Sequence, residues 1–235
     1  MTDGLFLFVY MSGSCLFDEL SILELLSLTL WTMLTRRIHH YSGMTIALFV
    51  TLHLTNHTVS LMGIEKHIEV MTQLRKIYRN IFAEVLLLSA VSVQIFSGIQ
   101  LYRSRFKTAK GFYEKLQLWS GLYLAIFFVI HLSAVMVGRF ILKLDTNFYF
   151  GAAGLNRFPF NLFFIPYYSL AIFSFFAHIA SVHHNKMKER NRNARKQSRL
   201  IIIVGVVMVF MLMYGLTNGF NGIAIPSEYG ILIGK

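Results

Sequence analysis

The sequence predicts an all-α membrane protein in which four transmembrane helices form a bundle beside a peripheral fifth helix. Hydrophobic residues make up 55% of the 235 residues and charged residues only 14%, whereas soluble globular proteins carry about 25% charged residues. The chain has three prolines, which suits long uninterrupted helices. This composition argues against a water-soluble enzyme. The formal charge of +11 does not by itself indicate a nucleic-acid partner, because the charges lie between apolar stretches.

Five stretches are long and apolar enough to cross a bilayer, which requires about 20 residues. They are residues 42–63, 80–102, 117–141, 162–183 and 200–220. Residues 1–34 are interrupted by acidic residues and lack the basic start of a signal peptide, so we expect a non-spanning interfacial or docking segment. Residues 35–220 then form the five-helix domain, and residues 221–235 form a short tail on the outer side.

The distribution of Lys and Arg predicts the orientation of the helices. Fourteen of the 22 lie in residues 36–37, 103–116 and 185–199, all on one side of the predicted spans. This inner side is expected to face the cytoplasm of a bacterium, or the mitochondrial matrix if the membrane is the mitochondrial inner membrane. The basic run 185–199 fits either attraction to anionic lipid or docking of an acidic soluble subunit.

Four histidines fall well inside the predicted spans: His53, His57, His131 and His178. Polar residues in the hydrocarbon are costly and usually face the bundle interior or a functional site. A single buried histidine is most simply an interhelical hydrogen-bond partner. Four in one small bundle favour a functional cluster.

Two of these histidines belong to an internal repeat. Ser42-Gly43 precedes His53-Leu54 by nine residues, and Ser120-Gly121 precedes His131-Leu132 by the same nine. Both helices start on the inner side, so both imidazoles lie about 15 Å from their glycines along the helix axis. Two imidazoles at one depth can ligate a haem iron from opposite sides. Zinc fits less well, because it prefers four ligands and this set has no Cys and only one acid.

Helical spacing places the polar residues of each of the first four spans on one face, together with apolar residues of the same stripe. The fifth span has no ionisable residue and no such stripe, which makes it the peripheral helix. The stripes are Ser42, Thr45, Phe49, His53, Asn56 and Ser60; Glu84, Leu87, Val91, Gln94, Gly98 and Leu101; Gln117, Gly121, Leu124, Phe128, His131, Val135 and Gly138; and Tyr167, Ala171, Ser174, His178 and Ser181.

These residues resemble the cytochrome b membrane-anchor subunits of succinate dehydrogenases and fumarate reductases, in their single-chain, five-helix form. The resemblance covers roughly residues 35–220. It rests on the run Arg36-Arg37-Ile38-His39 before Gly43 and His53, Leu116-Gln117 before Ser120-Gly121 and His131, Glu84, the run Gly98-Ile99-Gln100-Leu101-Tyr102, and His178.

The resemblance implies a subunit that is not catalytic alone. It would pass electrons between a soluble flavoprotein and iron–sulfur pair on the inner side and quinone in the bilayer. His53 and His131 would be the axial ligands of an outer haem b. The inner haem would need His178 and a histidine on the second span, where Gln94 stands four residues before Gly98. One haem is therefore expected, and a second would require His183 or a water molecule in place of the missing histidine.

Two groups of residues are candidates for the quinone. The inner group is Arg36, Arg37, His39, His40, Tyr41 and Ser42, of which Arg36, His39 and Ser42 could contact quinone or haem propionates. The outer group is Glu84, His57 and His67, with Glu84 as the proton carrier. Glu84 could equally be an interfacial or capping acid beside Arg79 and Asn80.

Three other functions fit the same residues. The chain could be a non-redox membrane anchor whose haem sites have decayed. It could be a subunit of another haem b membrane reductase, since those also use two axial histidines in a helical bundle. It could also be a small transporter that relays protons through intramembrane histidines, although no broken helix at mid-membrane is evident.

Overall fold

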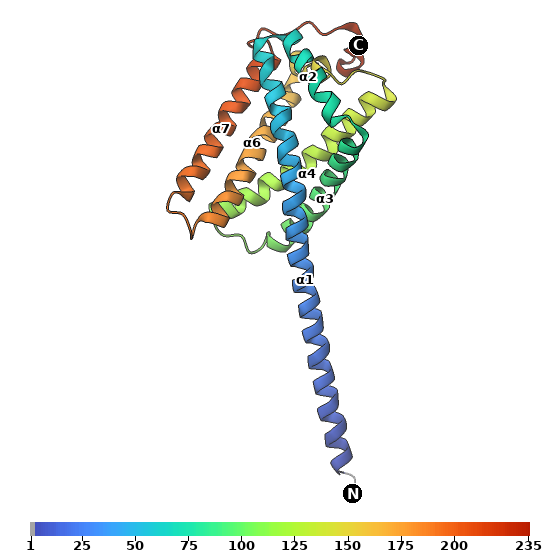
Figure 1. Ribbon diagram of the computed structural model, residues 1–235, viewed down its shortest axis with the longest axis vertical. Coiled ribbons are helices and arrows are strands. Elements are labelled where there is room, and N and C mark those ends of the chain that lie inside the picture. Colours follow the sequence, from blue (N-terminus) through green and yellow to red (C-terminus); the bar gives the residue numbers. More distant parts are fainter. Residues whose placement is uncertain (1–2) are drawn as a thin grey trace.

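The computed structural model describes residues 3–235, and every regular element in this range is a helix. Four helices are long and apolar enough to cross a membrane. They are α3 (Ile81–Arg105), α4 (Phe112–Met136) with the π-helical turn η2 (Val137–Ile141), α6 (Asn161–Met187) and α7 (Ala194–Leu216). They run up and down in a bundle (Figure 1). The chain is therefore a multi-pass membrane protein.

The first predicted span, 42–63, is not among these four. It forms the end of α1 (Asp3–Thr58) followed by the 3-10 turn η1 (Val59–Met62). Two histidines, an asparagine and several threonines lower its hydropathy. The same part of α1 nevertheless packs along α3, where Ile46 is buried against Ala90 and Val91.

The helix α1 is continuous over 56 residues, so no break marks the expected boundary between residues 34 and 35. The boundary is instead the point along α1 where contact with the other helices of the bundle begins. From residue 24 to residue 34 every described side chain is exposed, and Thr35 is the first buried one. Figure 1 shows this N-terminal part of α1 extending well beyond the bundle. Its role as an interfacial or docking segment stays a prediction.

The helices contact one another in a closed order: α1 with α3, α3 with α4, α4 with α6, α6 with α7, and α7 with α1 and η1. At Gly205 of α7 the backbone approaches α6 so closely that an added Cβ would lie 2.5 Å from Cβ of Phe176. The last helix therefore lies at the edge of the bundle in Figure 1 but is firmly packed against α6.

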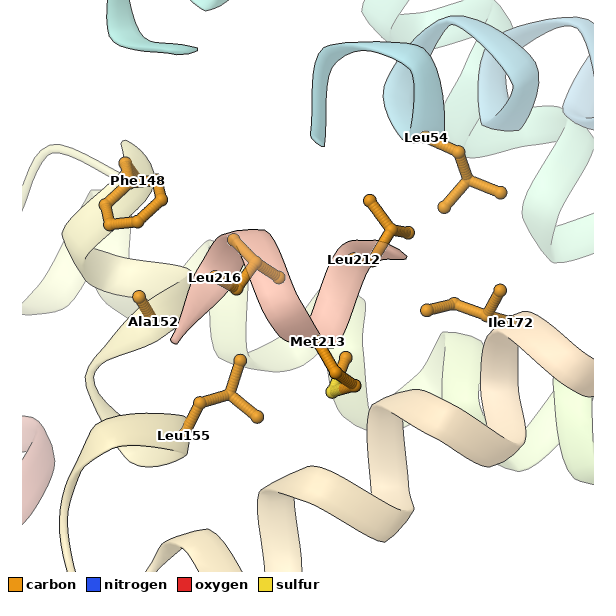
Figure 2. Packing of buried hydrophobic residues seen from close by; sticks show 8 residues of the cluster. All are labelled: Leu54, Phe148, Ala152, Leu155, Ile172, Leu212, Met213 and Leu216. Carbon is orange, nitrogen blue, oxygen red and sulfur yellow. The ribbon is translucent and has the colours of Figure 1, made fainter. Parts of the chain in front are cut away.

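The main hydrophobic core lies where α1, α6, α7 and α5 (Phe148–Ala152) meet (Figure 2). Because α7 supplies three of its members, this helix contributes directly to the stability of the bundle. The core residues are Leu54, Phe148, Ala152, Leu155, Ile172, Leu212, Met213 and Leu216.

The end of the bundle that carries this core is covered by short elements. Residues 64–78 form the amphipathic helix α2 (Ile64–Tyr78), with His67 and Met71 buried. The tail forms η4 (Ser227–Ile233), in which Tyr229 is buried. Its hydroxyl lies 3.0 Å from both the backbone oxygen of Asp145 and Oδ1 of Asn147. The tail therefore packs back over the loop that follows η2.

The opposite end carries the basic segments 36–37, 103–116 and 185–199 and is called the basic end below. The end with α2, α5 and η4 is called the covered end. Figure 1 shows the loops α3–α4 and α6–α7 together at the basic end, with the C-terminus at the covered end.

Candidate functional site

The bundle brings His53 of α1 and His131 of α4 together, as their matched depth predicts. Their ring centroids are 6.4 Å apart and their planes are inclined by 68°. Phe49 stacks on His53 at 5.6 Å and Phe127 stacks on His131 at 5.0 Å. Each imidazole is thus held against one aromatic ring of its own helix.

The spacing of this pair is compatible with two imidazoles on opposite sides of one metal. Metal–nitrogen bonds of about 2.0 Å place the two nitrogens about 4 Å apart and the ring centres about 6 Å apart. Among the described hydrogen bonds none involves His131, whereas Nε2 of His53 lies 3.2 Å from Nε2 of His57. The two imidazoles could therefore ligate one metal ion together. His53 would then have to give up its hydrogen bond to His57.

His53 is the first member of a chain of three hydrogen-bonded imidazoles. Nε2 of His57 bonds to Nε2 of His53, and Nδ1 of His57 lies 3.2 Å from Nε2 of His67 on α2. Each neutral imidazole has one donor and one acceptor nitrogen. Because Nδ2 of Asn56 donates to Nε2 of His67, this nitrogen is an acceptor. The chain therefore runs in one direction, from the Nε2–H of His53 to His57 and from the Nδ1–H of His57 to His67.

The far end of this chain is buried beneath α5. His67 packs edge-on against Phe148 and also lies 3.3 Å from Nδ2 of Asn56. Its Nδ1 and the Oδ1 of Asn56 are buried without a hydrogen-bond partner. Burial, with a smaller contribution from Arg75, lowers the pKa of His67 to about 4. His67 is thus neutral at pH 7.

A second polar cluster ties α1 to α3 nearer the basic end. His39 Nδ1 lies 2.9 Å from Oγ of Ser97, which itself donates to the backbone oxygen of Val93. Nε2 of Gln94 lies 3.1 Å from Nε2 of His39, and Ser42 Oγ donates to Oε1 of Gln94 at 2.7 Å. If His39 carries its proton on Nδ1, each of these hydrogen bonds joins one donor to one acceptor.

Small residues such as glycine could make room for a macrocycle between the helices, but polar side chains lie against such glycines in the structure. An added Cβ at Gly43 would meet Gln94 at 3.3 Å, and one at Gly98 would meet His39 at 3.3 Å. At Gly121 it would meet His178 at 3.0 Å. The glycines therefore admit these side chains between the helices.

His178 of α6 is held against α4. Its Nδ1 lies 3.0 Å from the backbone oxygen of Gln117 and 3.3 Å from Oγ of Ser120. Donation from Nδ1 to a backbone carbonyl leaves Nε2 as the free nitrogen, which is how many metal-binding histidines are oriented. Burial lowers the pKa of His39 to about 4, with smaller contributions from nearby His178 and His40. His39 is therefore neutral at pH 7, and the side chain of Gln94 contacts α1 through it.

Glu84 forms an ion pair with Arg139, which lies on the π-helical turn η2. Nη1 of Arg139 bonds to Oε1 of Glu84, and Nη2 lies 3.5 Å from Oε2. Asn80, not Glu84, caps α3 by accepting from the backbone N–H of Phe82. No described contact joins Glu84 to His57 or His67, so the expected outer group is divided between an ion pair and an imidazole chain.

The expected inner group is also divided. His39 and Ser42 belong to the Gln94 network, whereas Arg37, His40 and Tyr41 are exposed. Arg36 lines a cavity of about 360 Å³ between α1 and α3. Seven of its eight lining residues have polar side chains: Thr32, Thr35, Arg36, Gln100, Leu101, Ser104, Arg105 and Thr108, of which Leu101 is the apolar one. His183 belongs to neither group. Its Nε2 lies 3.0 Å from Oε1 of Gln197.

Sequence reasoning missed Arg139 as the partner of Glu84. The sequence contains a signal for this pairing. Arg139 lies at the end of an otherwise apolar span, and Glu84 lies at the start of the antiparallel span at the same level of the bundle. It also missed Ser97 as the partner of His39, although Ser97 precedes Gly98 on the same helix. Among the described residues, no group of three or more His, Cys, Asp or Glu side chains has the arrangement of a metal site. A haem takes only two ligands from the protein, so a haem site would not form such a group of three.

The fold defines the class: an all-helical, multi-pass membrane protein with two buried clusters of histidines and polar side chains. No protein-family profile, curated protein or solved structure matches the chain.

Proposed function

We propose that this chain anchors a complex in the membrane and carries electrons between a soluble flavoprotein and iron–sulfur pair and quinone. It would hold one haem b through His53 and His131. The observation that carries the proposal is the 6.4 Å separation of these two ring centroids between α1 and α4. The repeat in the sequence predicts that the two histidines lie at equal depth. The proximity of their rings in the bundle supports this prediction independently.

The proposal includes a fifth crossing by residues 42–63. In this part of α1, Ile46, Leu54 and Asn56 are buried in the bundle, while Met44, Leu48 and Leu52 are exposed. Large apolar side chains on the exposed face and Asn56 on the buried face suit a lipid environment. The chain would then cross the membrane five times, with the basic end facing the cytoplasm or matrix.

When bound, haem b supplies a one-electron carrier between the soluble partners and quinone. His53 and His131 would hold it, and Phe49 and Phe127 would fix the orientation of the two rings. His57 would keep its bond to His67 through Nδ1 after releasing His53. The polar cavity beside Arg36 would take the quinone head group, since its hydroxyls and guanidinium can donate to quinone oxygens.

A second haem would use His178, whose Nε2 is the nitrogen left free by its bond to Gln117. Its partner would be His39, because Gln94 is a weak ligand and contacts α1. We propose a single haem, because His39 forms hydrogen bonds through both ring nitrogens, to Ser97 and Gln94, whereas His53 forms one, to His57.

The test is the haem content of the protein purified in mild detergent, measured by the pyridine haemochrome assay and by the low-spin absorption spectrum. We expect about one haem per chain. His53→Ala and His131→Ala should each abolish the low-spin signal, and His40→Ala, which alters an exposed histidine, should leave it unchanged. A full low-spin spectrum in either ligand variant would contradict the assignment of these two ligands.

The haem number is tested by His178→Ala, for which the one-haem proposal predicts an unchanged ratio of haem to protein. A fall from two to one would establish a second site. A folded wild-type protein that never takes up haem would instead favour the non-redox anchor. Mass spectrometry of co-purifying subunits distinguishes the proposed partners from those of another haem b membrane reductase.

One observation favours a second candidate function, proton transport. The hydrogen-bonded chain His53–His57–His67 can pass a proton by shifting the proton on each imidazole in turn. Protein reconstituted in liposomes with a pH-sensitive dye would then leak protons, and His57→Phe would block the leak while leaving α1 helical. Equal proton fluxes in the two proteins would exclude this function.

A further inference from the structure

The basic end contains a cavity of about 600 Å³ between the start of α4, the end of α6 and the start of α7. Three cationic side chains line it: Lys188 follows α6, and Arg195 and Arg199 stand one turn apart on α7. The remaining lining residues are Gly111, Phe112, Tyr113, Glu114, His184, Asn185 and Ile202.

The walls of this cavity carry more positive than negative charge. Glu114 is their single acid, and its Oε2 accepts hydrogen bonds from the backbone N–H groups of Lys110 and Gly111. Its other oxygen is 4.0 Å from Nζ of Lys188. Arg195 and Arg199 take part in none of the ion pairs found among the described residues, so two guanidinium groups remain for an anionic ligand.

His184, which also lines the cavity, has a ring nitrogen without a hydrogen-bond partner. His184 stacks on Tyr113 with ring centroids 3.9 Å apart, and its Nδ1 is buried without a hydrogen-bond partner. Buried polar atoms are normally paired. A polar ligand in the cavity could provide the missing partner.

The cavity lies at the level where the apolar surface of the bundle begins. Directly after Arg199, the side chains of Leu200, Ile203 and Val207 are exposed on α7. An aromatic cluster of Tyr102, Phe106 and Trp119 marks the same end of the neighbouring helices. Aromatic side chains gather at membrane–water interfaces. The cavity is therefore placed where lipid head groups lie.

We propose that this cavity binds the phosphate group of an anionic glycerophospholipid, with its acyl chains lying on the exposed apolar face of α7. Arginine forms two parallel hydrogen bonds to phosphate, and two arginines one turn apart can hold one such group. Basic pockets between transmembrane helices suit lipid head groups. This assignment concerns the basic end alone and is independent of whether the chain binds haem.

The test is lipid binding by the delipidated full-length protein, followed by native mass spectrometry during titration with phosphatidylglycerol or phosphatidylcholine. We expect phosphatidylglycerol to bind more tightly. The double variant R195Q/R199Q should weaken its binding about tenfold or more, given roughly 1 kcal/mol for each basic residue near the membrane surface. R192Q/K196Q is the matched control, because it removes the same charge from the same region without altering the cavity lining.

Three outcomes would overturn the proposal. One is equal loss of phosphatidylglycerol binding in the two double variants, which would indicate a diffuse charge effect. Another is displacement of the lipid by millimolar inorganic phosphate, which would make the ligand free phosphate. The third is unchanged lipid binding in R195Q/R199Q together with loss of a co-purifying soluble subunit, which would make the cavity a protein-docking site. Far-ultraviolet circular dichroism and the melting temperature establish that both variants fold.

Discussion

Gln94 of α3 and His39 of α1 are joined through their side chains, with 3.1 Å between the two Nε2 atoms. The resemblance to cytochrome b anchor subunits predicts a haem ligand at the position of Gln94. In this chain its amide lies between His39 and Ser42 and closes a network that runs from Ser97 to Ser42. The same position therefore holds two helices together.

The first prediction concerns this network. Gln94→Leu preserves the approximate volume but leaves Nε2 of His39 and Oγ of Ser42 without their partner in a half-buried region. We expect the variant to be less stable by about 1–3 kcal/mol, because unpaired buried polar groups are costly. The measurement is thermal melting in detergent. Ser92→Ala, which alters an exposed residue of the same helix, should leave the melting temperature nearly unchanged.

The second prediction concerns the ion pair between Glu84 and Arg139. A double-mutant cycle of Glu84→Gln, Arg139→Gln and the combined variant should give a coupling energy of about 1 kcal/mol, because the pair is partly exposed. If Glu84 also carries protons, Glu84→Gln should slow quinone-linked turnover without changing haem content, and the combined variant should remain slow. Wild-type turnover in Glu84→Gln would leave the ion pair as its whole role.

The third prediction concerns pH and His67. The pKa of His67 is about 4 in the folded protein, whereas an unperturbed histidine in the unfolded chain has a pKa of 6.5. Between these two pH values only the unfolded chain binds a proton at this residue. Stability that is present above pH 6.5 is therefore lost as the pH falls towards 4, by an amount on the order of 3 kcal/mol. His67→Gln keeps a polar side chain that does not titrate. Its melting temperature should fall less between pH 7.5 and pH 4.5 than that of the wild type, and parallel curves would contradict the assignment.

The fourth prediction concerns the tail. Tyr229→Phe removes the hydroxyl that contacts Asp145 and Asn147, and should cost about 1 kcal/mol. The loss should appear as faster hydrogen exchange in residues 143–149 and 227–233. The control is Tyr214→Phe, which alters a more exposed tyrosine on α7. Equal exchange rates in both variants would indicate that the tail is held by other contacts.

Several features could be predicted from the sequence because they depend on local composition and helical geometry. The apolar runs predicted the four spans now seen as α3, α4 with η2, α6 and α7, to within a few residues at most ends. The repeat of glycine and histidine at equal spacing predicted that His53 and His131 would meet, because equal rise along parallel helices gives equal depth. Neither inference needs knowledge of how the helices pack.

Other features were decided by packing between segments far apart in the sequence. The pairing of Glu84 with Arg139 depends on the π-helical turn at the end of α4, and the burial of His67 depends on α2 lying against α1 and α5. The space beside Gly43, Gly98 and Gly121 could hold either a macrocycle or the side chains of Gln94, His39 and His178 as far as spacing alone tells. Periodicity states which face of a helix turns inward, but only the tertiary structure determines which side chain occupies the space there, because that depends on distances between helices.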